Sequence, residues 1–188
     1  MGDELVISSS APQGFSDLWS EDRERQNAAY EEMMKATGEP VSWAYEVWDE
    51  VVGNLAHEDN HNRAIAAQIL CNLALSDPEQ RILDGLAPLI EVTRDKRFVT
   101  ARHCLQSLWK IGLAGPAQRT AVVGALAARF ADCAPEKNST LIRNDIVVGL
   151  RNLHKATGDE TIERRAQALI ETEDDLKYRS KYAKSWRQ

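Results

Sequence analysis

Apolar residues recur at helical spacing along most of this chain. Four segments place apolar residues at positions i, i+4 and i+8, which form one stripe along an α-helix. The stripes are Val47, Val51 and Leu55; Ile82, Leu86 and Ile90; Val122, Leu126 and Phe130; and Ile162, Ala166 and Ile170. The pattern predicts four amphipathic helices.

Three more helices are predicted between these four. In each, an anchor residue is followed by apolar residues at +3, +7 and +10. The sets are Arg63, Ala66, Leu70 and Leu73; Ala101, Cys104, Leu108 and Ile111; and Arg143, Ile146, Leu150 and Leu153. Because the two patterns alternate strictly, we predict stacked helical hairpins of about 40 residues each.

Turn residues divide the chain at the places that these hairpins require. Asp77-Pro78 and Gly115-Pro116 each place a proline at the expected first position of a helix, and Gly158-Asp159 opens the last hairpin. We therefore predict repeats over about 42–75, 77–113, 116–156 and 158–188. A lead-in helix is expected over 20–36, with Ser20 as its N-cap, after a flexible tail over 1–14. Residues 15–188 are thus predicted to form a single helical-repeat domain.

The two-helix unit and its turns resemble the HEAT and armadillo superfamily of helical repeats. In that family an Asp in the turn precedes an apolar-Arg step that opens the second helix. The step is closest at Ile142-Arg143 and weaker at Asn62-Arg63, whereas Thr100-Ala101 replaces it in the middle unit. The resemblance, over about 42–176, implies an all-α right-handed superhelix of about four hairpins, whose second helices line a concave surface where partners dock. Ala101 indicates that the family's ladder of Asp and Arg residues is not continuous here.

Composition excludes several classes of protein. The 188 residues are 43% apolar and 28% charged, with 23 Lys and Arg against 29 Asp and Glu, a formal charge of −6. This acidic balance disfavours a broad grip on phosphate backbones. The longest apolar stretch, 121–128, is far shorter than the roughly 20 residues that cross a bilayer. No membrane association is predicted, and because the first residues do not have the pattern of an export signal, a cytoplasmic protein is expected. The odd number of cysteines, without a C-x-x-C pair, predicts reduced core thiols.

The polar faces of the second helices are the predicted binding site. Aligning these helices by their apolar positions stacks amides beside a tryptophan and several cations. The candidate residues are Gln68, Asn72, Arg102, Gln106, Trp109, Lys110, Asn144, Arg151 and Asn152. Since Trp and Arg dominate binding hot spots, we predict a non-enzymatic scaffold that binds a protein or peptide. No cofactor or small-molecule substrate is implied.

A nucleic-acid-binding or DNA-repair protein is the alternative. Some members of the superfamily resemble DNA glycosylases that hold DNA in a cationic groove, and Trp109, Asp145 and Arg151 match the residue types of that groove. The stretch 176–188 interleaves five Lys or Arg with aromatic residues and has no acid, so residues 1–176 carry a formal charge of −11. Such a stretch either contacts nucleic acid, pairs with an acidic partner, or folds as the cap of the stack.

One motif formally matches a zinc site. His57-Glu58-Asp59-Asn60-His61 has the H-E-x-x-H spacing, in which two imidazoles one helical turn apart bind zinc and the glutamate acts as a base. That mechanism requires a continuous helix, whereas Asp59 and Asn60 are typical of a turn before a new helix. We therefore predict an inter-helix turn and no metal site, with a zinc hydrolase as a third hypothesis.

Overall fold

The computed structural model describes residues 10–188, and this part of the chain is helical without strands. Residues 1–9 of the predicted tail lie outside the described residues. The α-helices are α1 (Arg23–Ala36), α2 (Ala44–Asn54), α3 (Asn60–Leu73), α4 (Ile82–Val92), α5 (Phe98–Ser107), α6 (Pro116–Asp132), α7 (Ser139–Thr157), α8 (Glu160–Glu171) and α9 (Leu176–Arg187). The 3-10 helices are η1 (Gln13–Trp19), η2 (Ala74–Ser76) and η3 (Leu108–Leu113).

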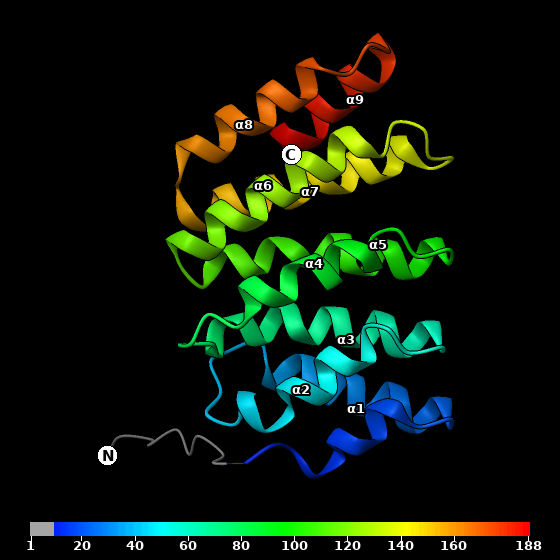
Figure 1. Ribbon diagram of the computed structural model, residues 1–188. Coiled ribbons are helices and arrows are strands. Elements are labelled where there is room, and N and C mark those ends of the chain that lie inside the picture. Colours follow the sequence, from blue (N-terminus) through cyan, green and yellow to red (C-terminus); the bar gives the residue numbers. More distant parts are fainter. Residues whose placement is uncertain (1–9) are drawn as a thin grey trace.

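The helices stack in two layers. In one layer α3 packs between α1 and α5, and α7 packs between α5 and α9. In the other layer α6 packs between α4 and α8, while α2 lies against α3. Figure 1 shows the stack with α1 at one end and α9 at the other. We call α1, α3, α5, η3, α7 and α9 the second-helix layer, and its solvent side the second-helix face.

The core lies between the layers and follows most of the predicted stripes. The apolar residues predicted at +3, +7 and +10 on the three second helices are all buried. The stripe predicted for α4 is partly wrong: Ile82 is buried, but Leu86 and Ile90 are half-buried, while Leu89 and Val92 face the core. Because α4 is apolar on both of these stripes, its spacing alone does not determine which stripe faces inward.

The N-terminal end differs from the prediction in two respects. Gln13 and Gly14, predicted as tail, belong to η1, whose Phe15 and Leu18 are buried against the core. The first α-helix begins at Arg23, and its N-cap is Asp22, whose carboxylate accepts hydrogen bonds from two backbone N–H groups. Ser20, the predicted cap, instead accepts a hydrogen bond from the N–H of Asp22.

Only one of the two prolines begins a helix. Pro116 is the first residue of α6, as predicted. Pro78 instead lies in a turn, because the Asp77 carboxylate accepts hydrogen bonds from the N–H groups of Arg81 and Ile82 and thereby caps α4 four residues later. At the end of α7, Gly158 adopts φ 66°, the left-handed conformation that commonly ends a helix.

The C-terminal stretch folds as the last helix of the stack. Tyr182 is 0% exposed and Trp186 is 8% exposed, and α9 packs against α7 and α8. The phenol of Tyr182 donates a hydrogen bond to the Thr140 carbonyl at 3.2 Å. These two rings are therefore part of the core and are not presented to a partner.

Ion pairs join successive turns of the stack. Arg23 lies 2.6 Å from Asp59 and Arg63 lies 2.6 Å from Asp95. Farther along, Arg143 lies 2.7 Å from Glu173.

The pattern changes at Ala101, as its sequence suggested, since the second helix of that hairpin has no arginine at this position. There, Glu136 of the next turn pairs with Arg129 of α6.

No helix within residues 10–188 combines the length and apolar character needed to cross a bilayer.

Candidate functional site

The nine predicted binding residues all lie in the second-helix layer. Gln68 and Asn72 are on α3, Arg102 and Gln106 on α5, Trp109 and Lys110 on η3, and Asn144, Arg151 and Asn152 on α7. The structure thus brings them onto four neighbouring elements of this layer. Most of them are hydrogen-bonded within the chain, and this determines how much of each remains for a partner.

The two amides on α3 join neighbouring elements. Gln68 accepts a hydrogen bond from the phenol of Tyr30 on α1 at 2.9 Å. Asn72 is buried, donates to the Thr37 hydroxyl at 3.0 Å, and accepts from the Lys110 ammonium at 2.8 Å. Because their polar atoms are already used, these amides hold helices together and offer little to a ligand.

Arg102 forms a bidentate pair with Asp145 across α5 and α7. Its Nε and NH2 atoms lie 2.7 and 2.9 Å from the carboxylate oxygens, and the Gln106 amide reaches the same carboxylate at 3.4 Å. The hydrogen bond to Asp145 raises the pKa of Arg102, although burial opposes this shift. The side chain of Asp145 is 5% exposed, so the acid that a DNA-glycosylase groove requires is already bound by Arg102.

Arg151 lies between α7 and α9. Its NH1 donates to the Ser185 carbonyl at 2.8 Å, and its NH2 donates to Asn152 Oδ1 at 3.2 Å. Its Nε is buried and has no hydrogen-bond partner within the described residues. Asn144 accepts a hydrogen bond from the Ser185 hydroxyl at 2.9 Å, which fixes α9 beside this part of α7.

Trp109 is half-buried and packs on the core beside α7. A Cβ atom placed on Gly149 would lie 3.6 Å from Trp109 Cβ, an ordinary van der Waals distance. Gly149 of α7 thus lies against the Trp109 side chain of η3. One part of the indole supports the packing of the two elements while another part faces solvent.

The sequence prediction missed a cavity of about 160 Å³ between α1, α3 and α5. Its lining includes Tyr30, Ala64, Gln68, Val99 and His103. Val99 is 67% exposed, although it is a large apolar side chain. Val99 lies off the apolar stripe of its helix, and this misplaced apolar residue is the sequence signal that identifies the cavity.

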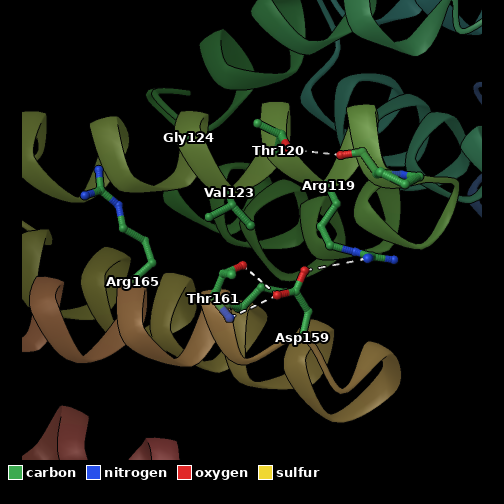
Figure 2. A pocket seen from close by; sticks show the side chains of 9 residues that line it. Arg119, Thr120, Val123, Gly124, Asp159, Thr161 and Arg165 are labelled. Carbon is green, nitrogen blue, oxygen red and sulfur yellow. Dashed lines mark hydrogen bonds and ion pairs between the residues drawn. The ribbon is translucent and has the colours of Figure 1, made fainter.

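A second cavity, of about 380 Å³, lies between α6 and α8 on the opposite layer (Figure 2). Asp159 on its wall accepts hydrogen bonds from the backbone N–H and the hydroxyl of Thr161, and lies 3.7 Å from Arg119. The hydrogen bond from the Thr161 hydroxyl is the largest influence that lowers the pKa of Asp159. Arg119 also donates to the Gly112 carbonyl. These polar groups cap and join helices, so this cavity is not our candidate site.

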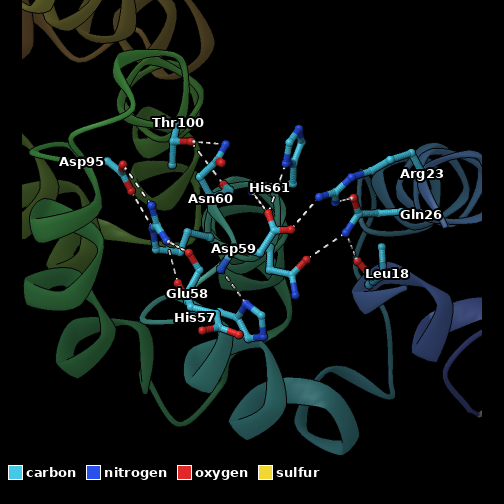
Figure 3. A network of polar contacts seen from close by, with 12 residues as sticks. Leu18, Arg23, Gln26, His57, Glu58, Asp59, Asn60, His61, Asp95 and Thr100 are labelled. Atoms are coloured by element: carbon cyan, nitrogen blue, oxygen red, sulfur yellow. Dashed lines mark hydrogen bonds and ion pairs between the residues drawn. The ribbon is translucent and has the colours of Figure 1, made fainter. Parts of the chain in front are cut away.

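His57, Glu58 and Asp59 lie in the turn between α2 and α3, whereas His61 lies in the first turn of α3, so the motif does not occupy one continuous helix (Figure 3). His57 Nδ1 lies 3.0 Å from the backbone N–H of Asp59, while His61 Nδ1 lies 3.1 Å from the Asp59 carboxylate. Asp59 caps α3 and pairs with Arg23, whose hydrogen bond holds the pKa of Asp59 far below its ordinary range. Within residues 10–188, no group of three His, Cys, Asp or Glu side chains has an arrangement that could hold a metal ion.

Comparisons with known proteins add no family to these observations. No model of a protein family matches this chain, and none of the curated proteins is significantly similar to it.

Proposed function

We propose that this chain is a non-enzymatic, cytoplasmic helical-repeat protein that binds a protein or peptide through its second-helix face. In this proposal the four hairpins wind into a right-handed superhelix of the HEAT and armadillo type, with the second-helix face on the concave side. The alternation of the two layers and the ion pairs between turns support such an architecture.

The observation that carries the proposal is the cavity between α1, α3 and α5. It combines exposed apolar surface, contributed mainly by Val99, with the exposed imidazole of His103. An apolar recess with a few polar groups at its rim fits a single side chain of a polypeptide. Its volume of about 160 Å³ is smaller than the roughly 300 Å³ or more of typical small-molecule sites.

Neighbouring groups extend this surface toward the C-terminal end of the stack. Gln106 is exposed, and Arg102, Trp109 and Lys110 are each partly exposed on the elements that follow Val99. An aromatic ring and cations beside an apolar recess are typical of the centre of a protein interface. A partner segment that lies across α3, α5 and η3 would contact both parts.

Affinity capture with two matched variants tests the proposal. Val99→Asp places a charge at the recess, and Leu176→Asp makes the same change at a side chain that is 72% exposed on α9. We expect tagged wild-type protein and Leu176→Asp to recover the same polypeptides from native lysate, and Val99→Asp to lose them at least tenfold by quantitative mass spectrometry.

A second variant, Trp109→Ala, tests the neighbouring surface in the same assay and is expected to reduce recovery as well. Equal recovery by the wild type and by both Val99→Asp and Trp109→Ala would contradict the proposal. Circular dichroism of each variant checks that the fold is retained.

A further inference from the structure

Positive charge is concentrated in the C-terminal half of the second-helix layer. The elements α5, η3, α7 and α9 carry ten Lys and Arg residues against a single acid, Asp145. The ten are Arg102, Lys110, Arg143, Arg151, Lys155, Lys177, Arg179, Lys181, Lys184 and Arg187. These elements therefore carry a formal charge of +9 in a chain of −6, which leaves −15 on the rest.

Few of these cations have a carboxylate partner within the chain. Arg102 pairs with Asp145 and Arg143 pairs with Glu173. The other eight lie beyond 4.0 Å from any carboxylate of residues 10–188. On a typical protein surface, interspersed acids balance most of the cations. Eight cations without a carboxylate partner therefore give this side of the protein an excess of positive charge.

Two of the unpaired cations are partly buried in the face. The Lys110 ammonium contacts the neutral Asn72 side chain, and burial lowers the pKa of Lys110. Arg151 donates to Asn152 and to a backbone carbonyl, both neutral, and its Nε has no partner within the described residues. A partly buried cation without a counter-charge is costly, and an anion that binds beside it removes this cost.

Two exposed lysines of α9 continue the patch. Ser185 contacts Asn144 and Arg151, so this side of α9 faces the polar side of α7. Lys181 lies one helical turn before Ser185, and Lys184 is adjacent to it; both are exposed. We call Lys110, Arg151, Lys181 and Lys184 the cationic patch.

We propose that the partner of the second-helix face is an acidic polypeptide segment, whose carboxylates bind the cationic patch. This inference rests on the proposed function, because it names the charge of the segment that this face takes. The patch extends from α3, where the Lys110 ammonium lies, across η3 and α7 to α9. Since helices pack about 10 Å apart, it spans about 30 Å. About nine or ten residues of extended chain cover that length.

The observations favour a polypeptide over a nucleic acid. Two of the three aromatic residues among the α9 cations, Tyr182 and Trp186, are buried and therefore unable to stack on bases. The third, Tyr178, is half-buried, and its ring already stacks on Tyr182 with centroids 6.4 Å apart. The rest of the chain carries −15, so a long polyanion that extends beyond the patch is repelled, whereas a short acidic segment stays within it. The amides of Asn144, Asn152 and Gln106 beside the cations suit the backbone of a peptide.

Fluorescence anisotropy with a labelled peptide of about ten glutamates tests the inference at low salt, about 50 mM. We expect binding that weakens about tenfold or more in Lys181→Gln/Lys184→Gln and in Lys110→Gln/Arg151→Gln. The control Lys96→Gln/Lys137→Gln removes two lysines from turns outside the patch and is expected to bind as the wild type does. The α9 pair is exposed, so its variant keeps the test valid if Lys110→Gln/Arg151→Gln fails to fold.

The same assay is repeated with a decamer of lysine and with single- and double-stranded oligonucleotides. These ligands test whether binding requires an acidic peptide. Loss of polyglutamate binding in the patch variants alone supports the inference. Absent polyglutamate binding, equal binding by all variants, or tighter patch-dependent binding of an oligonucleotide would overturn it. Such a failure is distinguishable from failure of the proposed function, because Trp109→Ala in the capture experiment removes an apolar contact and changes no charge.

Discussion

Arg129 and Glu136 form a bidentate ion pair in which the arginine side chain is 0% exposed and the glutamate remains partly exposed. The two guanidinium nitrogens lie 2.5 and 2.8 Å from the carboxylate oxygens. The same guanidinium donates to the hydroxyl and the carbonyl of Thr93 at the end of α4. Arg129 thus joins the α6–α7 turn to the α4–α5 hairpin. In that hairpin Ala101 occupies the position that Arg63 has on α3 and Arg143 has on α7.

We expect Arg129→Met to lower the free energy of unfolding by about 3 kcal/mol, because it removes one member of a buried pair and leaves the Thr93 carbonyl without its donor. Urea unfolding followed by circular dichroism measures this loss. Arg94→Met is the matched control, since Arg94 pairs with Glu91 and Asp132 nearby but is more exposed, and should cost less than about 1 kcal/mol. An equal loss of unfolding free energy in the two variants would show that Arg129 does not hold the α6–α7 turn on the neighbouring hairpin.

Asp59 makes the stability of the N-terminal half depend on acid pH. Its hydrogen bond with Arg23 lowers its folded-state pKa far below the unfolded value of about 3.9. The ionised carboxylate therefore contributes stability above about pH 4, and this contribution is lost as the pH falls toward the folded-state pKa. The pair is partly exposed, so solvent screening limits the contribution to about 1 kcal/mol.

We expect Arg23→Gln to lose about that amount at neutral pH and to depend less on pH below about pH 5 than the wild type does. Asp174→Asn, which removes an exposed carboxylate from the α8–α9 turn, serves as the control and should retain the wild-type profile. Thermal melts across this pH range compare the three proteins. Parallel profiles for Arg23→Gln and the wild type would refute the assignment.

Much of the fold follows from local periodicity, and this is why the sequence predicts it. Burial of Leu70, Leu108 and Leu150 repeats at one position of three helices, because each helix must bury one stripe against its neighbours. The failure at Pro78 has an equally local cause. There the Asp77 side chain competes for backbone donors and delays the helix, and this competition depends on a rotamer that spacing does not specify.

The candidate site was harder to predict, since its polar atoms depend on contacts between distant helices. Lys110 donates a hydrogen bond to Asn72, 38 residues away in the sequence, and Arg151 donates one to the Ser185 carbonyl, 34 residues away. The repeat alignment placed these residues on one face but did not show which donors the chain itself would use. Val99 was missed because the alignment compared polar positions of the helices, whereas the cavity between α1, α3 and α5 is marked by this exposed apolar residue.

Gly112 occupies a place where no side chain fits. A Cβ atom there would lie 2.6 Å from Leu153 Cδ2, and Leu153 is itself buried in the core. We expect Gly112→Ala to cost about 1–3 kcal/mol by overpacking. Gly124 on α6 has no atom within 4 Å of its would-be Cβ, so Gly124→Ala should stabilise the protein by up to about 1 kcal/mol through helix propensity. Urea unfolding should show a lower free energy of unfolding for Gly112→Ala and a higher one for Gly124→Ala. Destabilisation by both changes would contradict the open space at Gly124.

Tyr182 holds the last helix on the stack. Its ring lies edge-on to Phe130, with centroids 6.1 Å apart, and its hydroxyl binds the Thr140 carbonyl. Burial raises the pKa of Tyr182, so the phenol stays protonated and keeps donating at alkaline pH. We expect Tyr182→Ala to cost about 3–5 kcal/mol, and Tyr182→Phe, which keeps the ring, to cost about 1 kcal/mol.

Hydrogen exchange locates this effect. Because α9 has neighbours on one side of the stack only, it can open without the rest. In Tyr182→Ala the amides of α9 should therefore exchange faster while those of α3 stay protected, and Tyr182→Phe should remain close to the wild type. Uniformly faster exchange across α3 and α9 in Tyr182→Ala would instead mean that the hairpins unfold as one unit, and that Tyr182 stabilises the whole stack and not its last helix alone.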